Sequence, residues 1–288
     1  MKLKYIFFAL RPKTLSAAIL PVLAVAAYVY PANLKLCGFA LLSALCIQIA
    51  SNLFNDAIDH KKGVDNEDRL GPLRATQMQW LSAKQVYILA SIFCIAAVIL
   101  AIPLIQAGGM PILFLGLVSL SLAYLYTGGP YPLAYYGLGD VFVFLFFGLG
   151  ATKGTYFLYH HDFSLDIFVL ACQCGFLCTV LIAINNLRDI DGDKKANKRT
   201  LAVLLGKSFV RREILFLYTA AFLLQIYWFY TSKSAFYLLP FLLVIPAFSL
   251  IKEIMLNPPS KIYNRYLAKS SGIYIAFIIL QSGAFLCT

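Results

Sequence analysis

The sequence predicts an all-α protein that crosses a membrane about nine times, and three observations lead to this fold class. Of the 288 residues, 61% are hydrophobic and only 13% are charged, which is far more apolar than a soluble domain of this size. Apolar stretches of spanning length recur from one end of the chain to the other. The stretches lack the alternation of a barrel strand, and because only helices and closed barrels satisfy backbone groups in lipid, each is interpreted as a helix.

Nine spans are predicted, and together they form a single domain over residues 1–288. They cover residues 14–30, 35–55, 85–105, 110–126, 139–158, 166–187, 212–231, 235–251 and 267–286. The apolar segment before the first span is interrupted by Arg11, Pro12 and Lys13, so we expect no cleaved signal peptide. The seven cysteines lie in or beside apolar runs, which indicates packing rather than disulfides or a thiolate metal site.

The positions of the basic residues predict the orientation of the spans. If the N-terminus is cytoplasmic, the loops after the second, fourth, sixth and eighth spans are cytoplasmic as well, and 21 of the 24 Lys and Arg residues fall on that side. We therefore expect a protein integral to the cytoplasmic (inner) membrane, with its N-terminus and its active-site loops in the cytoplasm. The same topology accounts for the net charge of +11, so no nucleic-acid partner is expected.

A charged segment, NLFNDAIDHKKGVDNEDRLGPLR at residues 52–74, lies at the end of the second span. Asp56 and Asp59 are three positions apart, which places both carboxylates on one side of a helix end, and Asp65 follows in the loop. Acidic groups beside a membrane span are costly, so this cluster indicates a functional site.

A second cluster, NNLRDIDGDKKANKRT at residues 185–200, lies at the end of the sixth span and repeats the first. With an offset of 133 residues, Asn52 aligns with Asn185 and Asp56 aligns with Asp189, and paired lysines follow in both segments. We therefore interpret the two segments as duplicated elements whose carboxylates face each other across a central cavity.

The side-chain oxygens of both segments suit Mg²⁺ that is also bound by substrate phosphates. The predicted metal ligands are Asn52, Asp56, Asp59, Asp65, Asn185, Asp189 and Asp193. Two clusters predict two Mg²⁺ ions and an anionic, phosphorylated substrate. The side chains predicted to contact a diphosphate are Asn52, Lys61, Arg69, Arg74, Asn185, Arg188, Lys194, Lys198 and Arg199. The alternative for each cation is that it anchors a helix end and follows the topology rule.

Four segments of the chain resemble the UbiA family of intramembrane aromatic prenyltransferases. They are RPKTLSAAILPVLA at 11–24, DRLGPLRATQ at 68–77, YTGGPYPLAYYGLGDVFVFLFFG at 126–148 and NNLRDIDGDKKANKRTLAVLLG at 185–206. The resemblance covers nearly the whole chain and includes the nine spans and both Asp-rich motifs, the first of which also contains Asn55. Within the family, these segments are most similar to the branch that prenylates 1,4-dihydroxy-2-naphthoate in menaquinone biosynthesis.

The resemblance implies a reaction that the residue chemistry also permits. A Mg²⁺-dependent enzyme transfers a polyprenyl group from polyprenyl diphosphate to the aromatic ring, the carboxyl group leaves as CO₂, and diphosphate and demethylmenaquinol are released. Asp56, Asp59, Asp189 and Asp193 would then be catalytic. The polyprenyl tail requires an apolar route open to membrane lipid, and the aromatic residues expected to line it are Phe142, Phe144, Phe146 and Phe147.

Two further residues between the fourth and fifth spans are predicted to be catalytic. A tyrosine ring can stabilise an allylic cation, and Tyr126, at the end of the fourth span, is preferred for this role over Tyr124, Tyr131, Tyr135 and Tyr136. The alternative for each is that tyrosines populate membrane interfaces for ordinary reasons. Asp140 stands where the resembling branch usually carries Glu. It either orients or deprotonates the hydroxyl of the naphthoate, or it caps the fifth helix.

Two alternatives to this function follow from the same features. Repeats and buried carboxylates also occur in ion-coupled transporters, whose sites lie near the bilayer midplane, whereas these carboxylates lie at the ends of spans beside basic clusters. Within the prenyltransferase interpretation, the acceptor is alternatively another dihydroxynaphthoate isomer, 4-hydroxybenzoate or homogentisate. Lys153, inside the fifth span, is expected to extend toward the far membrane face or to find a partner.

Overall fold

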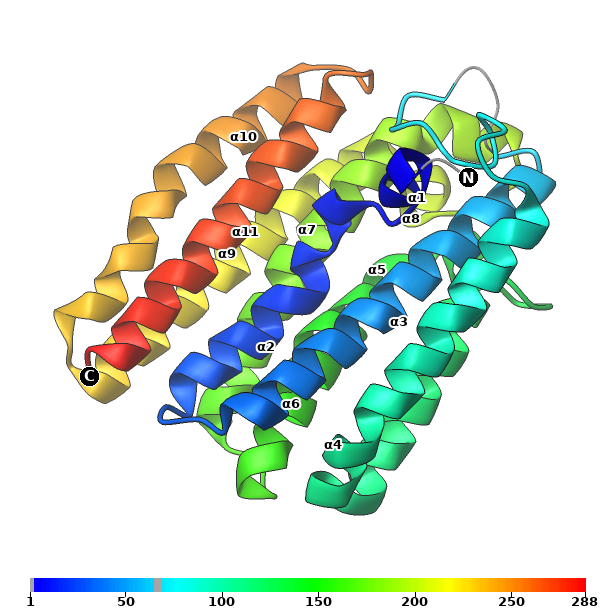
Figure 1. The fold of residues 1–288 in the computed structure, drawn as a ribbon. Helices are drawn as coiled ribbons and strands as arrows, with labels where there is room; N and C mark the ends of the chain where they lie inside the picture. The colour runs from blue at the N-terminus through cyan, green and yellow to red at the C-terminus, as the bar shows by residue number, and fades with distance from the viewer. Residues whose placement is uncertain (1–2, 65–68) are drawn as a thin grey trace.

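In the computed structural model, residues 3–64 and 69–288 are described, and every regular element among them is a helix (Figure 1). The first half contains α1 (Leu3–Ala9), η1 (Pro12–Thr14), α2 (Ser16–Tyr28), α3 (Leu34–Lys61), α4 (Ala83–Leu125), η2 (Leu133–Tyr135), α5 (Gly139–Val143), η3 (Phe144–Gly150) and α6 (Ala151–His160). The second half contains α7 (Leu165–Lys195), α8 (Leu201–Leu205), α9 (Lys207–Ser232), η4 (Ala235–Leu243), α10 (Val244–Leu256) and α11 (Tyr263–Leu286). The predicted all-α fold class is confirmed.

Seven helical segments among the described residues are apolar and long enough to cross a membrane. The 43-residue α4 is about twice as long as one span needs, because an ideal helix rises about 1.5 Å per residue and the hydrocarbon core is about 30 Å thick. Gly109 breaks α4 with φ 65° and ψ −150°, and Figure 1 shows the chain reversing there. With α4 divided at this glycine and the shorter apolar helix α2 added, the structure has a helix for each of the predicted spans.

Two helices continue beyond their predicted ends at residues 55 and 187. The α3 helix ends at Lys61 and the α7 helix ends at Lys195, so the acidic clusters lie on the last helical turns rather than in loops. Hydropathy marks where the apolar surface ends, but the backbone hydrogen-bond pattern continues through Asn, Asp and Lys. The first helix-breaking conformations after these helices are at Gly63, with φ 73°, and Asn197, with φ 55°.

The long α7 helix is the centre of the bundle. Of its most apolar 18-residue window, 72% is buried, more than in any other spanning helix of the described residues. At its tightest contact, Gly148 of the π-helical turn η3 packs on α7. A Cβ added at Gly148 would lie 2.6 Å from the Cα of Gly175 and 2.7 Å from the carbonyl oxygen of Ala171. The two backbones therefore approach as closely as small residues allow.

Buried amides connect α7 to the helices around it. Gln225 accepts a hydrogen bond from Gln173 at 2.9 Å, and it donates to Gln281 at 2.7 Å and to the carbonyl of Tyr237 at 2.9 Å. The three glutamines are completely buried. Because lipid offers no hydrogen-bond partners, these polar groups fix how α7, α9 and α11 pack.

Lys153 finds partners within its own end of the bundle, as the sequence predicts. Its ammonium lies 5.0 Å from the ring centroid of Phe163 and 5.1 Å from that of Phe168. Aromatic faces attract a cation and replace part of its lost hydration.

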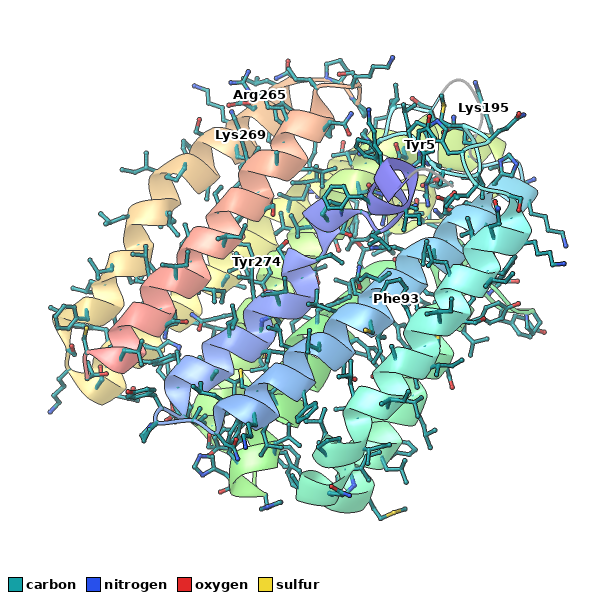
Figure 2. The ribbon with its side chains drawn as sticks, in the orientation of Figure 1. Tyr5, Phe93, Lys195, Arg265, Lys269 and Tyr274 are labelled. Carbon is teal, nitrogen blue, oxygen red and sulfur yellow. The ribbon has the colours of Figure 1, made fainter. Side chains whose placement is uncertain are left out.

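Most of the charged side chains among the described residues lie at one end of the bundle, which is called the polar end below. Figure 1 places α1, α8 and the C-terminal ends of α3 and α7 at this end, while the C-terminus of the chain lies at the other. Figure 2 shows Lys195, Arg265 and Tyr5 at the polar end and Phe93 and Tyr274 within the span of the bundle. Both Asp-rich elements therefore end on the same side of the molecule.

The contact at Gly148 gives a test of the packing. We expect Gly148→Ala to lower the thermal midpoint in detergent, because an overpacked core costs about 1–3 kcal/mol and the atoms in the way are backbone atoms. Gly272→Ala is the matched control, since a Cβ there meets nothing within 4 Å. Equal thermal midpoints for the two variants would contradict the close α7–η3 contact.

Candidate active site

The two acidic clusters meet through Lys198. Its amine lies 3.8 Å from Oδ2 of Asp59, on α3, and 3.8 Å from Oδ1 of Asp193, on α7. Asp59 is 1% exposed and Asp193 is 4% exposed. Burial alone lowers the pKa of the Lys198 amine, but the two carboxylates outweigh it and raise that pKa above its ordinary value. Two segments that are distant in the sequence thus share one buried charge cluster.

Asp59 is the most densely contacted carboxylate of this cluster. Its Oδ1 accepts a hydrogen bond from the Tyr135 hydroxyl at 2.8 Å, and its Oδ2 accepts one from the Arg74 guanidinium at 3.3 Å. Lys62 lies 3.9 Å above the Tyr135 ring and donates to the Thr127 carbonyl at 3.0 Å. Burial lowers the pKa of the Lys62 amine, although Asp59 attracts its charge. The loop after α3, through Arg74, and the loop after α4, through Tyr135, therefore both contact Asp59.

The two asparagines at the acidic end of α3 have different hydrogen-bond partners. Asn55 accepts a hydrogen bond from the hydroxyl of Thr127, on the side of Asp59 and Tyr135. Asn52 instead donates to the Leu10 carbonyl at 3.3 Å and to the Thr14 hydroxyl at 3.0 Å. Contacts rather than helix geometry separate these residues, since seven residues turn a helix by about 700° and leave Asp59 only about 20° from Asn52.

Asp56 shares the side of α3 that Asn52 occupies. It is 1% exposed and accepts hydrogen bonds from the Ala75 amide at 2.9 Å, from the Thr76 amide at 3.3 Å and from the Thr76 hydroxyl. Asn52 and Asp56 thus bind protein groups away from Lys198. Asn55 is the site residue that the predicted ligand set omits, and its spacing to Asp59 equals that of Asn185 to Asp189.

The geometry favours a different register for the repeat. An offset of 130 residues pairs Asn55 with Asn185 and Asp59 with Asp189, which are the amide and carboxylate side chains on the side of the charge cluster. The offset of 133 pairs residues of the same type, but their surroundings in the structure differ. The spacing Asn-x₃-Asp does not choose between the two registers, because Asn52 and Asp56 share it with Asn55 and Asp59.

Arg188 organises the second cluster from within. It is 1% exposed, and its guanidinium donates to both Asp189 oxygens, at 2.8 and 2.6 Å. It also donates to the side-chain oxygens of Asn185 and Asn264, both at 2.8 Å. An arginine with these contacts holds its neighbours in place, so Arg188 positions Asn185 and Asp189 rather than reaching toward solvent.

The loop that follows the first cluster lies over Arg188. Asn264, at the start of α11, donates to the Leu70 carbonyl at 2.8 Å. A Cβ added at Gly71 would lie 2.7 Å from Nη2 of Arg188 and 3.1 Å from Nη2 of Arg69, so this position accepts only glycine without a shift. The loop therefore covers the second cluster while Arg74 contacts the first.

The other predicted diphosphate contacts lie nearer the surface. Lys61, Lys194 and Arg199 are exposed at the polar end, and the backbone amide of Arg199 donates to the Tyr135 carbonyl at 3.3 Å. Asp65, a predicted metal ligand, lies outside the described residues.

Asp140 is buried at the first turn of α5. It is 3% exposed, and its Oδ2 accepts a hydrogen bond from Asn186 at 3.1 Å. Its Oδ1 is buried without a hydrogen-bond partner among residues 3–64 and 69–288. Leu138 occupies the N-cap of α5 and no side chain caps this helix, so Asp140 does not have the capping role that the sequence left open.

Tyr126 stands between the charge cluster and the apolar interior. Its hydroxyl oxygen lies 3.0 Å from the position of a Cβ built on Gly139. Burial, and then the nearby charge of Asp140, raise the pKa of the Tyr126 phenol well above its ordinary value, so it remains protonated.

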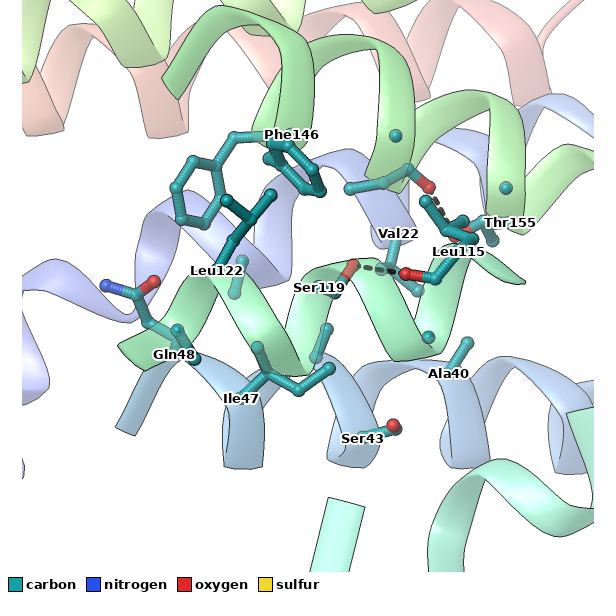
Figure 3. Close-up of a pocket in the computed structure, with 18 of the residues that line it drawn as sticks. Val22, Ala40, Ser43, Ile47, Gln48, Leu115, Ser119, Leu122, Phe146 and Thr155 are labelled. Carbon is teal, nitrogen blue, oxygen red and sulfur yellow. Dashed lines mark hydrogen bonds between the residues drawn. The ribbon is translucent and has the colours of Figure 1, made fainter. Parts of the chain in front are cut away.

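An apolar cavity of about 210 Å³ begins at Tyr126 and continues between α3, α4, η3 and α6 (Figure 3). Its polar edge includes Ser51 and Gln48, and Leu104 and Leu158 line it farther from the polar end. The expected aromatic lining is found for three of four residues: Phe142, Phe146 and Phe147. Phe144 instead packs against Phe176 of α7, with ring centroids 5.1 Å apart, because two residues turn a helix by about 200° and place it opposite Phe142.

The donor set of the charge cluster fits Mg²⁺ together with phosphate oxygens. Among the described residues, no three Asp, Glu, His or Cys side chains are grouped closely enough to hold a metal by themselves. Mg²⁺ is usually bound by one or two carboxylates together with substrate phosphates. The carboxylates of Asp59, Asp189 and Asp193 and the amides of Asn55 and Asn185 supply hard oxygen ligands of this kind.

Comparison with known proteins places the chain among membrane-embedded prenyltransferases. Residues 15–271 match the model of the UbiA prenyltransferase family, and the chain belongs to that family. The resemblance inferred from the sequence motifs is therefore confirmed. The transporter alternative is set aside, because the chain is a prenyltransferase.

The relatives include proteins named 1,4-dihydroxy-2-naphthoate octaprenyltransferase. The one from Haemophilus influenzae is 38% identical over 218 residues, which cover 71% of this chain and 70% of the relative. The one from Escherichia coli is 37% identical over 213 residues, which cover 71% and 69%.

Solved structures share the fold at lower sequence identity. A UbiA homolog from Archaeoglobus fulgidus, bound to GPP and Mg²⁺, is 18% identical and superimposes with a TM-score of 0.71 over 99% of this chain and 100% of that one. An apo UbiA homolog from Aeropyrum pernix K1 is 16% identical, with a TM-score of 0.70 over 92% and 96%.

The contacts of Arg188 predict that lysine cannot replace it. We expect Arg188→Lys to destabilise the protein by about 2–4 kcal/mol, because a lysine cannot reproduce the fork that bonds Asp189, Asn185 and Asn264. The measurement is the thermal midpoint in detergent. Arg212→Lys, at an exposed arginine of α9, is the control and should leave the midpoint unchanged. A midpoint for Arg188→Lys equal to that of the control would refute the positioning role.

Proposed function

We propose that this protein transfers a polyprenyl group from polyprenyl diphosphate to 1,4-dihydroxy-2-naphthoate, with loss of CO₂ and diphosphate, to give demethylmenaquinol. The observation that carries the proposal is the joining of a buried charge cluster, at Asp59, Lys198 and Asp193, to an apolar cavity that begins at Tyr126. A prenyl diphosphate has the same two parts, an anionic head and an apolar tail. The names of the Haemophilus influenzae and Escherichia coli relatives support the choice of acceptor.

The diphosphate lies, in this proposal, at the polar end between the two acidic helices. Lys198 and Arg74 contact its oxygens from within the cluster, since both already lie beside Asp59. The other basic side chains attract the substrate to this end and contact its outer oxygens: Lys61, Arg69, Lys194 and Arg199. A charge cluster of this kind in a water-poor site stabilises negative charge as the diphosphate leaves.

Mg²⁺ completes the site, and we propose two ions because there are two donor sets. Asn55 and Asp59 would hold one ion, and Asn185, Asp189 and Asp193 would hold the other, with Arg188 keeping the second set in place. The Archaeoglobus fulgidus homolog is described as bound to GPP and Mg²⁺, which supports Mg²⁺ as the metal. When bound, Mg²⁺ neutralises the diphosphate and makes it a better leaving group.

The residues around the cavity act on the prenyl group and on the acceptor. The C–O bond to diphosphate breaks, and Tyr126 faces the resulting allylic carbon, where its ring contributes about 1–2 kcal/mol of cation–π attraction. The ring carbon that carries the carboxyl group forms the new C–C bond. The bond to the carboxyl group then breaks, its electron pair returns to the ring, and CO₂ leaves.

Asp140 orients the acceptor. Its Oδ1 is buried and has no described hydrogen-bond partner, so it can accept a proton or hydrogen bond from a naphthoate hydroxyl while Asn186 holds Oδ2. Asp140 thereby acts on the acceptor rather than on the diphosphate.

The protein is integral to a membrane, and we propose that it lies in the cytoplasmic membrane with the polar end in the cytoplasm. The excess of Lys and Arg on one side of the spans supports this orientation. Prenyl diphosphate and naphthoate, both anionic, would then reach the site from the cytoplasm, while the tail remains among membrane lipid.

An acceptor panel tests the proposed reaction. Purified protein with Mg²⁺ and a polyprenyl diphosphate is expected to convert 1,4-dihydroxy-2-naphthoate to a prenylated naphthoquinol and CO₂, detected by mass spectrometry. The panel also contains a dihydroxynaphthoate isomer, 4-hydroxybenzoate and homogentisate. Faster turnover of one of these would replace the proposed acceptor. Asp59→Asn and Asp189→Asn are expected to reduce turnover at least about 100-fold, because each removes a carboxylate that would hold Mg²⁺ at the leaving group.

The cavity predicts which prenyl chains are accepted. Gly116 lines the cavity and a Cβ there meets nothing within 4 Å, so the side chain of Gly116→Phe begins in open space and takes up cavity volume. We expect kcat/KM for an eight-isoprene diphosphate to fall about tenfold more than kcat/KM for geranyl diphosphate, since only the long tail needs that volume. Gly38→Phe, at a glycine of α3 outside the cavity lining, is the control. An equal loss for both substrates would place the tail elsewhere.

A further inference from the structure

The segment from Arg69 to Thr76, called the strap below, crosses the polar end and is held at both of its ends. At one end, the Leu70 carbonyl accepts a hydrogen bond from Asn264 of α11 at 2.8 Å. At the other end, the amides of Ala75 and Thr76 donate to Asp56 of α3. The strap therefore joins the two halves of the bundle above the charge cluster.

Both carboxylate oxygens of Asp56 accept hydrogen bonds from the strap. Its Oδ2 lies 2.9 Å from the Ala75 amide nitrogen, and its Oδ1 lies 3.3 Å from the Thr76 amide nitrogen and also accepts the Thr76 hydroxyl. That hydroxyl also lies 3.1 Å from the backbone carbonyl oxygen of Asp56. Charge-assisted bonds from a buried carboxylate to backbone amides are strong, so this end of the strap is rigid.

The rigid end of the strap carries Arg74. This residue directly precedes Ala75, it is 7% exposed, and its Nη2 lies 3.3 Å from Oδ2 of Asp59. The position of the Ala75 amide therefore decides where the Arg74 side chain begins. If Asp56 released the amides of Ala75 and Thr76, the guanidinium would lose its fixed distance to Asp59.

We propose that Asp56 is a positioning residue and not a metal ligand: it fastens the strap so that Arg74 is held beside Asp59 at the diphosphate site. The proposal rests on the proposed function for the ligand that Arg74 contacts. It divides the first acidic motif into two roles. Asn55 and Asp59 serve the charge cluster, and Asp56 serves the loop that covers it.

Three variants with the same chemical change test this division: Asp56→Asn, Asp59→Asn and Asp191→Asn. Asp191 is the matched control, because its side chain is 77% exposed and it pairs with Lys207, also at the surface, at 3.6 Å. The first readout is hydrogen exchange of the peptide containing residues 70–80, in purified protein without substrate. We expect Asp56→Asn to speed exchange at Ala75 and Thr76 at least about tenfold, because an amide side chain offers one oxygen where the carboxylate offers two. Asp59→Asn and Asp191→Asn should leave it unchanged.

The second readout separates positioning from metal binding. For Asp56→Asn, we expect the KM for polyprenyl diphosphate to rise at least about tenfold, because a misplaced contact weakens binding by that order. The Mg²⁺ concentration that gives half-maximal activity should stay unchanged. For Asp59→Asn, the Mg²⁺ concentration that gives half of the remaining activity should rise. Thr76→Val, which removes one hydroxyl from the same clamp, should show a smaller rise in KM, and Thr76→Ser should restore the wild-type value.

The results separate a failure of the Asp56 proposal from a failure of the proposed function. A raised Mg²⁺ requirement in Asp56→Asn, with normal exchange at residues 75 and 76, would overturn the proposal and make Asp56 a metal ligand. An unchanged Mg²⁺ requirement in Asp59→Asn would instead overturn the metal assignment of the proposed function. If Asp56→Asn does not fold, the comparison of Thr76→Val with Thr76→Ser decides the question, and equal KM values for these two would count against the clamp.

Discussion

The attraction between Asp59 and the cations around it is the interaction on which the rest of the site depends. A carboxylate that is 1% exposed is stable only if it is paired and hydrogen-bonded, and Lys198, Arg74 and Tyr135 meet that need from three different segments. Each of these segments therefore contacts the same residue at the end of α3. The loops after α3, α4 and α7 therefore meet at one place, where we propose that the diphosphate binds.

At the acidic end of α7, the carboxylate charge is neutralised in a different way. Asp189 is neutralised within its own helix by Arg188, which also bonds Asn185 and reaches Asn264 of α11. The two halves of the site are therefore not equivalent. The first half takes its cations from loops, and the second half contains a buried arginine that fixes its geometry.

Much of the fold and part of the site follow from local patterns. Hydropathy predicts the spans because burial in lipid depends on each segment alone, and it places Asp59, Asp189 and Asp193 at the membrane edge. It misplaces the ends of α3 and α7 because a helix continues through charged residues. It also cannot separate Asn52 and Asp56 from Asn55 and Asp59. That choice depends on which loop packs against each residue, as the partners of Asp56 and Asp59 show.

The sequence by itself determined that this is a polytopic helical membrane protein of the UbiA prenyltransferase family, with two Asp-rich elements on one side. Composition and short motifs carry that information, because they reflect solvent and chemistry at single positions. Only the tertiary structure decided which acidic side chains meet, that Arg188 is an internal support, and that Asp56 holds the strap carrying Arg74. Those roles depend on contacts between residues up to 194 positions apart, such as Leu70 and Asn264, and local periodicity contains no record of them.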